Sequence, residues 1–219
     1  NVGGDDGAAD TRSGHGTHVA GSVSGNGTAS LAVQPDPVRG LAFESDLVFQ
    51  VNFADYLDTG LFLDTRPVRA LLRTLAAGKD FLNLFCYTGT ATVCAAAGGA
   101  RSTVSVDLSQ TYLGWAQRNL RLNGFGGREH ELIRADCREW VRRERRRFGL
   151  IYLDPPAFST SNAMRGTLDI QRDHVPLMLD TAQLLEPGGV LVFCTNLRRF
   201  KLDAAAMPAM SFVKKFRGE

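Results

Sequence analysis

Three aspartates follow short apolar runs that are typical of strands, and carboxylates at such places can accept hydrogen bonds from the hydroxyl or amino groups of a ligand. Asp107, Asp136 and Asp154 each stand at the end of one such run. In parallel sheets, ligands bind beyond the carboxyl ends of the strands. Alone, Asp107 or Asp136 is more often a loop residue or a helix cap, but together the acids indicate one polar binding edge.

The first two of these acids suit an adenosine pocket without phosphate-binding machinery. Asp107 is placed to accept hydrogen bonds from two ribose hydroxyls, and Asp136 from an adenine amino group. The loop of residues 85–91 can bring backbone close to a ligand at Gly89, but it has neither G-x-G-x-x-G spacing nor a P-loop lysine. S-adenosylmethionine fits this description, and its predicted contacts are Phe85, Tyr87, Thr88, Gly89, Asp107, Asp136 and Cys137.

The most specific signal is the string Asp-Pro-Pro-Ala-Phe at residues 154–158. Proline nitrogens carry no hydrogen, so nearby carbonyls and the Asp154 carboxylate would face the pocket as acceptors. Phe158 can stack on a base. The alternative is a proline turn that places Phe158 in the core. The predicted catalytic group is Asp154, Pro155, Pro156 and Phe158.

Strands and helices alternate along most of the chain, which predicts an α/β fold with a mostly parallel sheet covered on both faces. The predicted strands are residues 81–86, 103–107, 132–134, 150–153 and 190–194. Helical spacing of apolar residues is found at 63–75, 90–97, 109–123, in the arginine-rich stretch up to about residue 146, and at 173–185.

Basic residues after the last predicted strand indicate contacts with the phosphates of RNA. Arg172 and His174 stand at the start of a predicted helix near the predicted pocket. Three roles are open for His174: a contact with the substrate, a helix cap or a core residue. The arginines between residues 138 and 147 fit a solvated helix face as well as an RNA contact. The predicted substrate contacts are Arg172, Arg198, Arg199 and Lys201.

Five motifs between residues 51 and 203 resemble the C-terminal half of the bifunctional guanine methyltransferases of large-subunit ribosomal RNA. They are residues 55–64, 83–89, 119–124, 154–159 and 171–174. The resemblance implies a Rossmann-like, S-adenosylmethionine-dependent methyltransferase that acts on guanine N7 of large-subunit ribosomal RNA, with N2 left open. The sheet of this family continues with a final antiparallel strand pair, and after residue 203 the chain no longer resembles the family there. A fold that binds the cofactor without turnover is therefore an alternative.

Residues 1–50 differ from the rest in texture and charge, since they hold six acidic and only two basic side chains. The string Ser-Gly-His-Gly-Thr-His-Val-Ala-Gly at residues 13–21 resembles the histidine motif of subtilisin-like serine peptidases, which His15 would match. No matching nucleophilic serine turn follows, so an inactive peptidase fragment is the other alternative. The expected organisation is a chimera with a leader (1–50), a methyltransferase domain (51–203) and a divergent tail (204–219).

The composition is that of an ordinary globular chain, with 44% hydrophobic residues and a net charge of +2 over 219 residues. No apolar run approaches the roughly 18 residues of a membrane span. The four cysteines show no C-x-x-C spacing, which predicts buried thiols in a reducing compartment, with no metal site. We therefore expect a cytoplasmic protein without a membrane partner, and the sequence makes no prediction of its oligomeric state.

Overall fold

The computed structural model describes residues 33–36, 40–52, 59–160 and 166–207. Five strands form one sheet in the order β10-β7-β4-β5-β6, and every neighbouring pair is parallel. These strands are β4 (Asp80–Leu84), β5 (Ser102–Asp107), β6 (His130–Arg134), β7 (Phe148–Leu153) and β10 (Leu185–Phe193). The α/β fold with a parallel sheet, predicted from the sequence, is confirmed.

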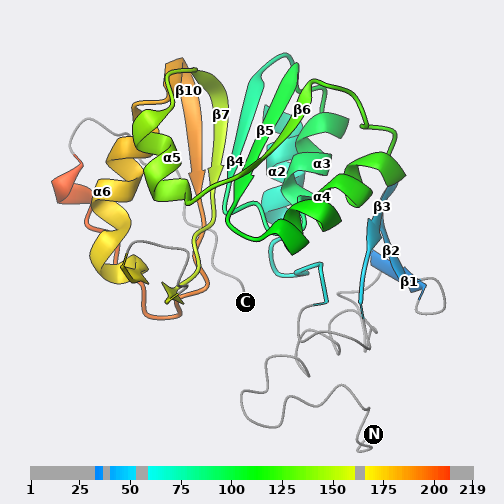
Figure 1. Ribbon diagram of the computed structural model, residues 1–219, viewed down its shortest axis with the longest axis horizontal. Helices are drawn as coiled ribbons and strands as arrows, with labels where there is room; N and C mark the ends of the chain where they lie inside the picture. The colour runs from blue at the N-terminus through cyan, green and yellow to red at the C-terminus, as the bar shows by residue number, and fades with distance from the viewer. Residues whose placement is uncertain (1–32, 37–39, 53–58, 161–165, 208–219) are drawn as a thin grey trace, which may run out of the picture.

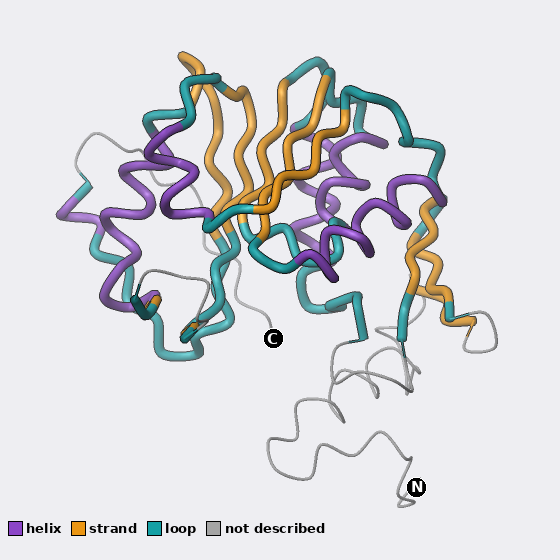
Figure 2. The backbone as a smooth tube through the Cα atoms, in the orientation of Figure 1, coloured by secondary structure: helices purple, strands orange, loops and turns teal. Residues whose placement is uncertain are grey.

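Helices cover both faces of this sheet (Figure 1). The tube in Figure 2 shows the same two layers of helices. The first layer consists of α2 (Arg66–Leu75), α3 (Thr90–Ala97) and α4 (Gln110–Leu122). The second layer consists of α5 (Cys137–Arg143) and α6 (Ile170–Ala182).

The two central strands show how the sequence fills both faces. In β4, Phe81 packs with α2 and α3, whereas Leu82 and Leu84 pack with α5 and α6. Asn83 also points to the first layer, where its Nδ2 donates to Thr92 Oγ1 at 2.8 Å. All six residues of β7 are buried. A strand buried on both faces must be apolar along its whole length, which is why β4 and β7 could be predicted from the sequence.

Shorter strands lie outside the main sheet. A three-stranded antiparallel sheet is formed by β1 (Val33–Asp36), β2 (Leu41–Glu44) and β3 (Leu47–Gln50). A small pair is formed by β8 (Phe158–Ser159) and β9 (Leu168–Asp169). One 3-10 turn, η2 (Ala204–Ala206), follows the main sheet and precedes Met207, which is fully buried in the core of the second layer.

The hairpin of β2 and β3 lies at the end of the predicted leader, directly before the domain predicted to begin at residue 51. Its Glu44 carboxylate is buried and pairs with Arg69 of α2. Asn123 fixes the other strand, because its Oδ1 accepts from the Val48 N–H at 2.8 Å and its Nδ2 donates to the Val48 carbonyl at 2.7 Å. The hairpin is therefore built into the same packing as the sheet and its helices.

Three expectations from the sequence remain to be compared with the structure. His15 lies outside the described residues. Within the part that is described, no strand follows β10, and β10 pairs with β7 alone; the expected lack of a final strand pair stays a prediction. No helix in the described part of the chain is both long enough and apolar enough to cross a bilayer.

Candidate functional site

The loop after β4 and the end of β5 are joined by the Asp107 carboxylate. Its Oδ2 accepts from the Tyr87 N–H at 2.9 Å, and its Oδ1 accepts from the Ser109 N–H at 2.8 Å. Burial raises the pKa of Asp107, although these hydrogen bonds act in the opposite direction. A carboxylate has about four acceptor positions, so further capacity remains for a ligand hydroxyl pair.

The same loop turns sharply, because Phe85, Tyr87 and Gly89 all have positive φ angles of 58°, 51° and 73°. Phe85 is held by its N–H, which donates to the buried Cys137 Sγ at 3.2 Å. The Cys137 thiol in turn donates to the Val106 carbonyl at 3.4 Å. Burial raises the pKa of this thiol well above its usual value, so it stays protonated and can act as a donor.

Two residues of this loop are fixed by contacts with other parts of the chain. Thr88 is fully buried, and its hydroxyl donates to the Gly60 carbonyl at 2.6 Å. A Cβ placed on Gly89 would lie 2.6 Å from the Cβ of Ala116 in α4. Gly89 therefore allows a close approach between the loop and α4. Thr88 and Gly89 thus have packing and positioning contacts in the structure, and their predicted contact with a cofactor stays a prediction.

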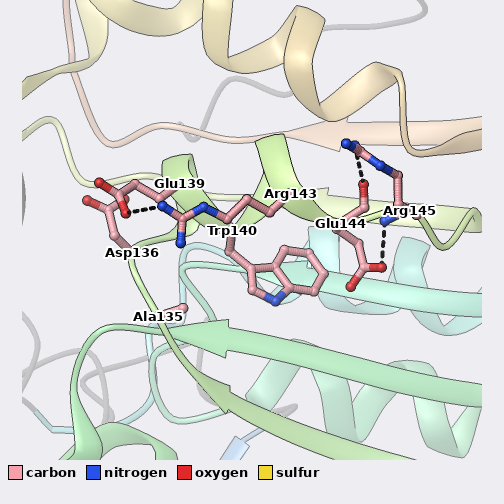
Figure 3. Close-up of a pocket in the computed structure, with 7 residues that line it drawn as sticks. All are labelled: Ala135, Asp136, Glu139, Trp140, Arg143, Glu144 and Arg145. Carbon is pink, nitrogen blue, oxygen red and sulfur yellow. Dashed lines mark hydrogen bonds and ion pairs between the residues drawn. The ribbon is translucent and has the colours of Figure 1, made fainter.

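Asp136 is the N-cap of α5 and lies beside the same edge. Its Oδ1 accepts from the Arg138 N–H at 2.9 Å, and its carboxylate forms an ion pair with the Arg138 side chain at 3.3 Å. Asp136 also lines the end of a groove along α5 (Figure 3). The predicted reading of this residue as a helix cap is thus confirmed, and its contact with adenine stays a prediction.

Asp154 follows β7, the strand next to β4. Tyr152 donates its hydroxyl to Asp154 Oδ2 at 2.8 Å. Burial raises the pKa of Asp154 to about 6; the Tyr152 hydrogen bond lowers it, and the nearby Asp64 charge raises it. Burial and the same pair of acids also raise the pKa of Cys194 to about 12, which places this thiol in the same neighbourhood. The edge thus holds a carboxylate that titrates close to neutral pH.

Phe158 presents an exposed aromatic ring near this carboxylate in the chain. Its side chain is 61% exposed, which is unusual for so large an apolar group. The short pairing of β8 with β9 fixes its backbone, and the Ala157 carbonyl accepts from the Ile170 N–H at 3.1 Å. Pro155 is buried and Pro156 is exposed. The alternative that Phe158 belongs to the core is wrong, because β8 turns its ring outward.

The predicted substrate-binding basic residues fall into two groups. Arg172 is occupied by Asp173, at 2.6 Å, and donates to the Thr167 carbonyl at 3.0 Å. In contrast, three exposed side chains on the segment after β10 form no ion pair within the part of the chain that the structure describes. They are Arg198, Arg199 and Lys201.

Two side chains of α6 hold this basic segment. Gln171 accepts from the Lys201 N–H and donates to the Lys201 carbonyl, both at 2.9 Å. His174, 3% exposed, accepts from the Asp203 N–H on Nε2 at 3.1 Å, and its Nδ1 lies 2.9 Å from the Gln171 carbonyl. An N–H can only donate, so Nε2 carries no proton and the ring is neutral with its hydrogen on Nδ1. Of the open readings of His174, the core position is the one observed.

Tyr152 and Gln171 belong to this edge but are not among the predicted site residues. Tyr152 stands two residues before Asp154, and residues at i and i+2 of a strand share one face, so the spacing could have indicated the pair. The role of Gln171 depends on a contact between residues 30 positions apart, for which the sequence has no local signal.

The chain matches a known family along most of its length. The model of a family described as S-adenosylmethionine-dependent methyltransferase matches residues 29–217. The match begins inside the predicted leader, at residue 29. The family match therefore includes the hairpin that Arg69 and Asn123 anchor, and it gives the expectation of a peptidase-derived chimera no support.

Two curated relatives share much of the sequence. A protein named ribosomal RNA large subunit methyltransferase K/L from Allochromatium vinosum is 64% identical over 162 residues. One of the same name from Methylococcus capsulatus is 60% identical over 162 residues. Each match covers 73% of this chain and 22% of the relative, so the chain spans about a fifth of the length of these relatives.

Solved structures show the same architecture. A methyltransferase described as complexed with SAH superimposes with a TM-score of 0.70 and 30% identity, and the match covers 80% of this chain and 46% of that one. An S-adenosylmethionine-dependent methyltransferase from Agrobacterium tumefaciens gives a TM-score of 0.63 and 28% identity, and covers 73% of this chain and 53% of that one.

The described edge fits the cofactor of this family. The Asp107 carboxylate, fixed by two backbone N–H groups, is an acceptor suited to the two hydroxyls of a ribose. The loop of residues 85–91 holds no lysine or arginine, as expected for a ligand that lacks phosphate groups. The family match, the fold and this edge together show that the chain belongs to the S-adenosylmethionine-dependent methyltransferases.

Proposed function

We propose that the chain transfers a methyl group from S-adenosylmethionine to a guanine of large-subunit ribosomal RNA, with N7 as the receiving atom. The observation that carries the proposal is the position of Asp107 and Asp154 at the carboxyl ends of β5 and β7, the two strands that flank β4, with Phe158 exposed on the segment after Asp154. The names of the curated relatives suggest the RNA. Such a reaction belongs in the cytoplasm, where ribosomal RNA is found.

S-adenosylmethionine supplies a methyl group bonded to a positively charged sulfur. In this proposal Asp107 accepts hydrogen bonds from the ribose hydroxyls of the cofactor, and the neighbouring Asp136 accepts from the adenine amino group. Thr88 and Cys137 act as positioning residues, because their own hydrogen bonds fix the loop on which Tyr87 and its neighbours sit.

Asp154 and Phe158 hold the guanine. Phe158 stacks on the base, and the ionised Asp154 accepts from the N1–H and from the amino group. Guanine N7 has a free electron pair and no hydrogen, so no general base is needed. Catalysis is then mainly the positioning of N7 in line with the methyl group, in a site from which water is excluded.

Guanine N2 is the second candidate, and one observation favours it. The pKa of Asp154 is raised to about 6, and a carboxylate in this range can act as a general base near neutral pH. Methylation of N2 requires the loss of an amino proton, which Asp154 could accept. The phosphates beside either target are bound by Arg198, Arg199 and Lys201.

The experiment uses tritium-labelled methyl cofactor and deproteinised large-subunit ribosomal RNA. RNA methylated at guanine N7 is cut by borohydride followed by aniline, whereas RNA methylated at guanine N2 resists this treatment. We expect labelled RNA that is cut at one position. Labelled RNA that resists cutting would show that the methyl group is on N2 and not on N7. A chain that binds the cofactor and leaves every RNA unlabelled would contradict the proposed reaction.

A further inference from the structure

A groove runs along α5, beside the edge strand β6 of the main sheet (Figure 3). Its volume is about 430 Å³, within the range of roughly 300–1,000 Å³ that small-ligand sites occupy. Asp136 lies at one end and Arg145 at the other, so the groove starts at the carboxyl edge of the sheet and leads away from it. The proposed methyl transfer does not use the far part of this groove.

Trp140 forms the aromatic wall of the groove. The guanidinium of Arg146 lies over its indole ring, 6.0 Å from the ring centre. Two carboxylates fix that guanidinium, Glu131 at 2.7 Å and Glu144 at 2.8 Å. The indole of Trp140 and the paired guanidinium of Arg146 therefore form a layer that is already held in place.

Glu144 also shapes the loop that carries the remaining arginines. Its Oε1 accepts from the N–H groups of Arg145 and Arg146 at 2.7 and 2.8 Å. The hydrogen bonds with Arg146 lower the pKa of Glu144 to about 2, so it stays ionised in neutral solution. The Glu144 carboxylate is therefore paired with Arg146 inside the loop. It fixes the backbone of Arg145 but does not neutralise the charge of the Arg145 side chain.

The lining of the groove holds three carboxylates, and each of them is paired with an arginine. Residues 138–147 contain six arginines and two glutamates. Arg143 pairs with Glu139 at 3.5 Å but keeps a side chain that is 78% exposed. Within the part of the chain that the structure describes, Arg145 and Arg147 form no ion pair. An acidic ligand would find these guanidinium groups beside a flat aromatic ring.

We propose that this groove binds a single-stranded segment of RNA, with one base against Trp140 and the phosphates on both sides of it on Arg143 and Arg145. Aromatic rings combined with a basic groove are the usual means of binding single strands without sequence preference. The inference rests on the proposed function, because it assumes an RNA substrate. It adds a second contact surface, by which the strand that leaves the catalytic edge is held along α5.

The test measures equilibrium binding of a fluorescein-labelled single-stranded decaribonucleotide by anisotropy, between 50 and 200 mM salt. The double variant Arg143→Ala with Arg145→Ala is compared with Arg121→Ala with Arg128→Ala, which removes two exposed arginines from α4 and the loop after it. We expect the first variant to bind about tenfold more weakly at low salt, with a salt slope lower by about 1.4, at about 0.7 for each phosphate contact. The second variant should bind like the wild type.

Trp140 supplies a second readout. The chain has two tryptophans, and Trp115 is only 5% exposed. A base stacked on Trp140 should quench the fluorescence of the wild-type chain, and Trp140→Phe should abolish this quenching. Cofactor binding by every variant confirms that it is folded.

Several results would overturn the inference: equal losses in both double variants, no loss in either, no RNA binding by the wild type, or displacement of RNA by polyglutamate at equal charge. Because binding is measured without methyl transfer, the two proposals fail separately. RNA binding that depends on Arg145 without any methylation would sink only the proposed reaction. Methylation with unchanged RNA affinity in the Arg145 variant would sink only the groove.

Discussion

The hydroxyl of Tyr152 lies 2.8 Å from Oδ2 of Asp154 and donates a hydrogen bond to it at the end of the central strand β7. The bond favours the ionised carboxylate, while burial favours the neutral form and raises the pKa of Asp154 to about 6. The balance of the two sets the pH at which this acid becomes an acceptor.

The rate of methyl transfer should follow the ionisation of Asp154. We expect kcat/KM to rise through about pH 6 and to level off above it, because only the ionised form can accept from guanine. Tyr152→Phe removes the hydrogen bond that lowers the pKa, so the inflection should move to higher pH. Identical pH profiles for wild type and Tyr152→Phe would show that this bond does not govern the reaction.

Asp154 should also reduce stability in neutral solution. Its pKa is raised in the folded chain, from 3.8 to about 6, so its contribution to stability is greatest below pH 4 and is lost as the pH rises through 6. Asp154→Asn should therefore be more stable than wild type by about 1–3 kcal/mol at pH 8, with the difference vanishing near pH 4. Urea unfolding at both pH values measures this.

Asp80 is the control of opposite sign. Its pKa is lowered by the hydrogen bond with Arg101, so its charge contributes stability above its unfolded pKa that is lost at low pH. Asp80→Asn should reduce stability at pH 8. If Asp154→Asn also reduces stability at pH 8, the Asp154 carboxylate is not held in the environment described.

Much of the fold could be predicted because its strands are apolar and its helices carry local signals. The predicted helix at residues 90–97 coincides with α3, and the predicted helix at 109–123 coincides with α4 and its cap Ser109, which accepts from the Tyr112 N–H at 3.3 Å. The edge strand β10 begins at Leu185, five residues before the predicted start, because the glycines at 188 and 189 were read as a turn before the strand.

The site could be predicted only in part, because its polar residues act through contacts far apart in the sequence. The strand-end acids Asp107 and Asp154 follow from the position of the strands. The buried bond from Thr88 to Gly60 joins residues 28 positions apart, and no local pattern indicates it. The hairpin was assigned to a foreign leader for the same reason: Glu44 makes sense only beside Arg69.

Gly89 should be required for stability through its contact with α4. Gly89→Ala introduces a Cβ at 2.6 Å from that of Ala116, at a φ of +73°. Gly78 has a similar φ of +69° but no atom within 4 Å of an added Cβ, so Gly78→Ala bears only the backbone strain. We expect Gly89→Ala to lose about 1–3 kcal/mol more than Gly78→Ala in the free energy of unfolding. Equal losses would mean that the loop can move away from α4.

The hairpin should stabilise the whole domain. Glu44→Gln leaves the guanidinium of Arg69, which is 1% exposed, without its carboxylate partner, and breaking such a buried pair costs about 3–5 kcal/mol. The matched control is Asp46→Asn, which breaks the exposed pair with Arg73 and should cost much less. Differential scanning calorimetry compares the two, and a Glu44→Gln chain as stable as wild type would show that the hairpin is not part of the domain.

The most direct test is a calorimetric titration of S-adenosylmethionine into the wild type, Asp107→Asn and Asp80→Asn. Asp107 lies at the carboxyl end of β5, and Asp80 at the opposite end of β4. Loss of a charged acceptor for the ribose hydroxyls should weaken binding about 10- to 100-fold in Asp107→Asn. Asp80→Asn should bind like the wild type. Equal affinities in all three chains would contradict a cofactor site at this edge of the sheet.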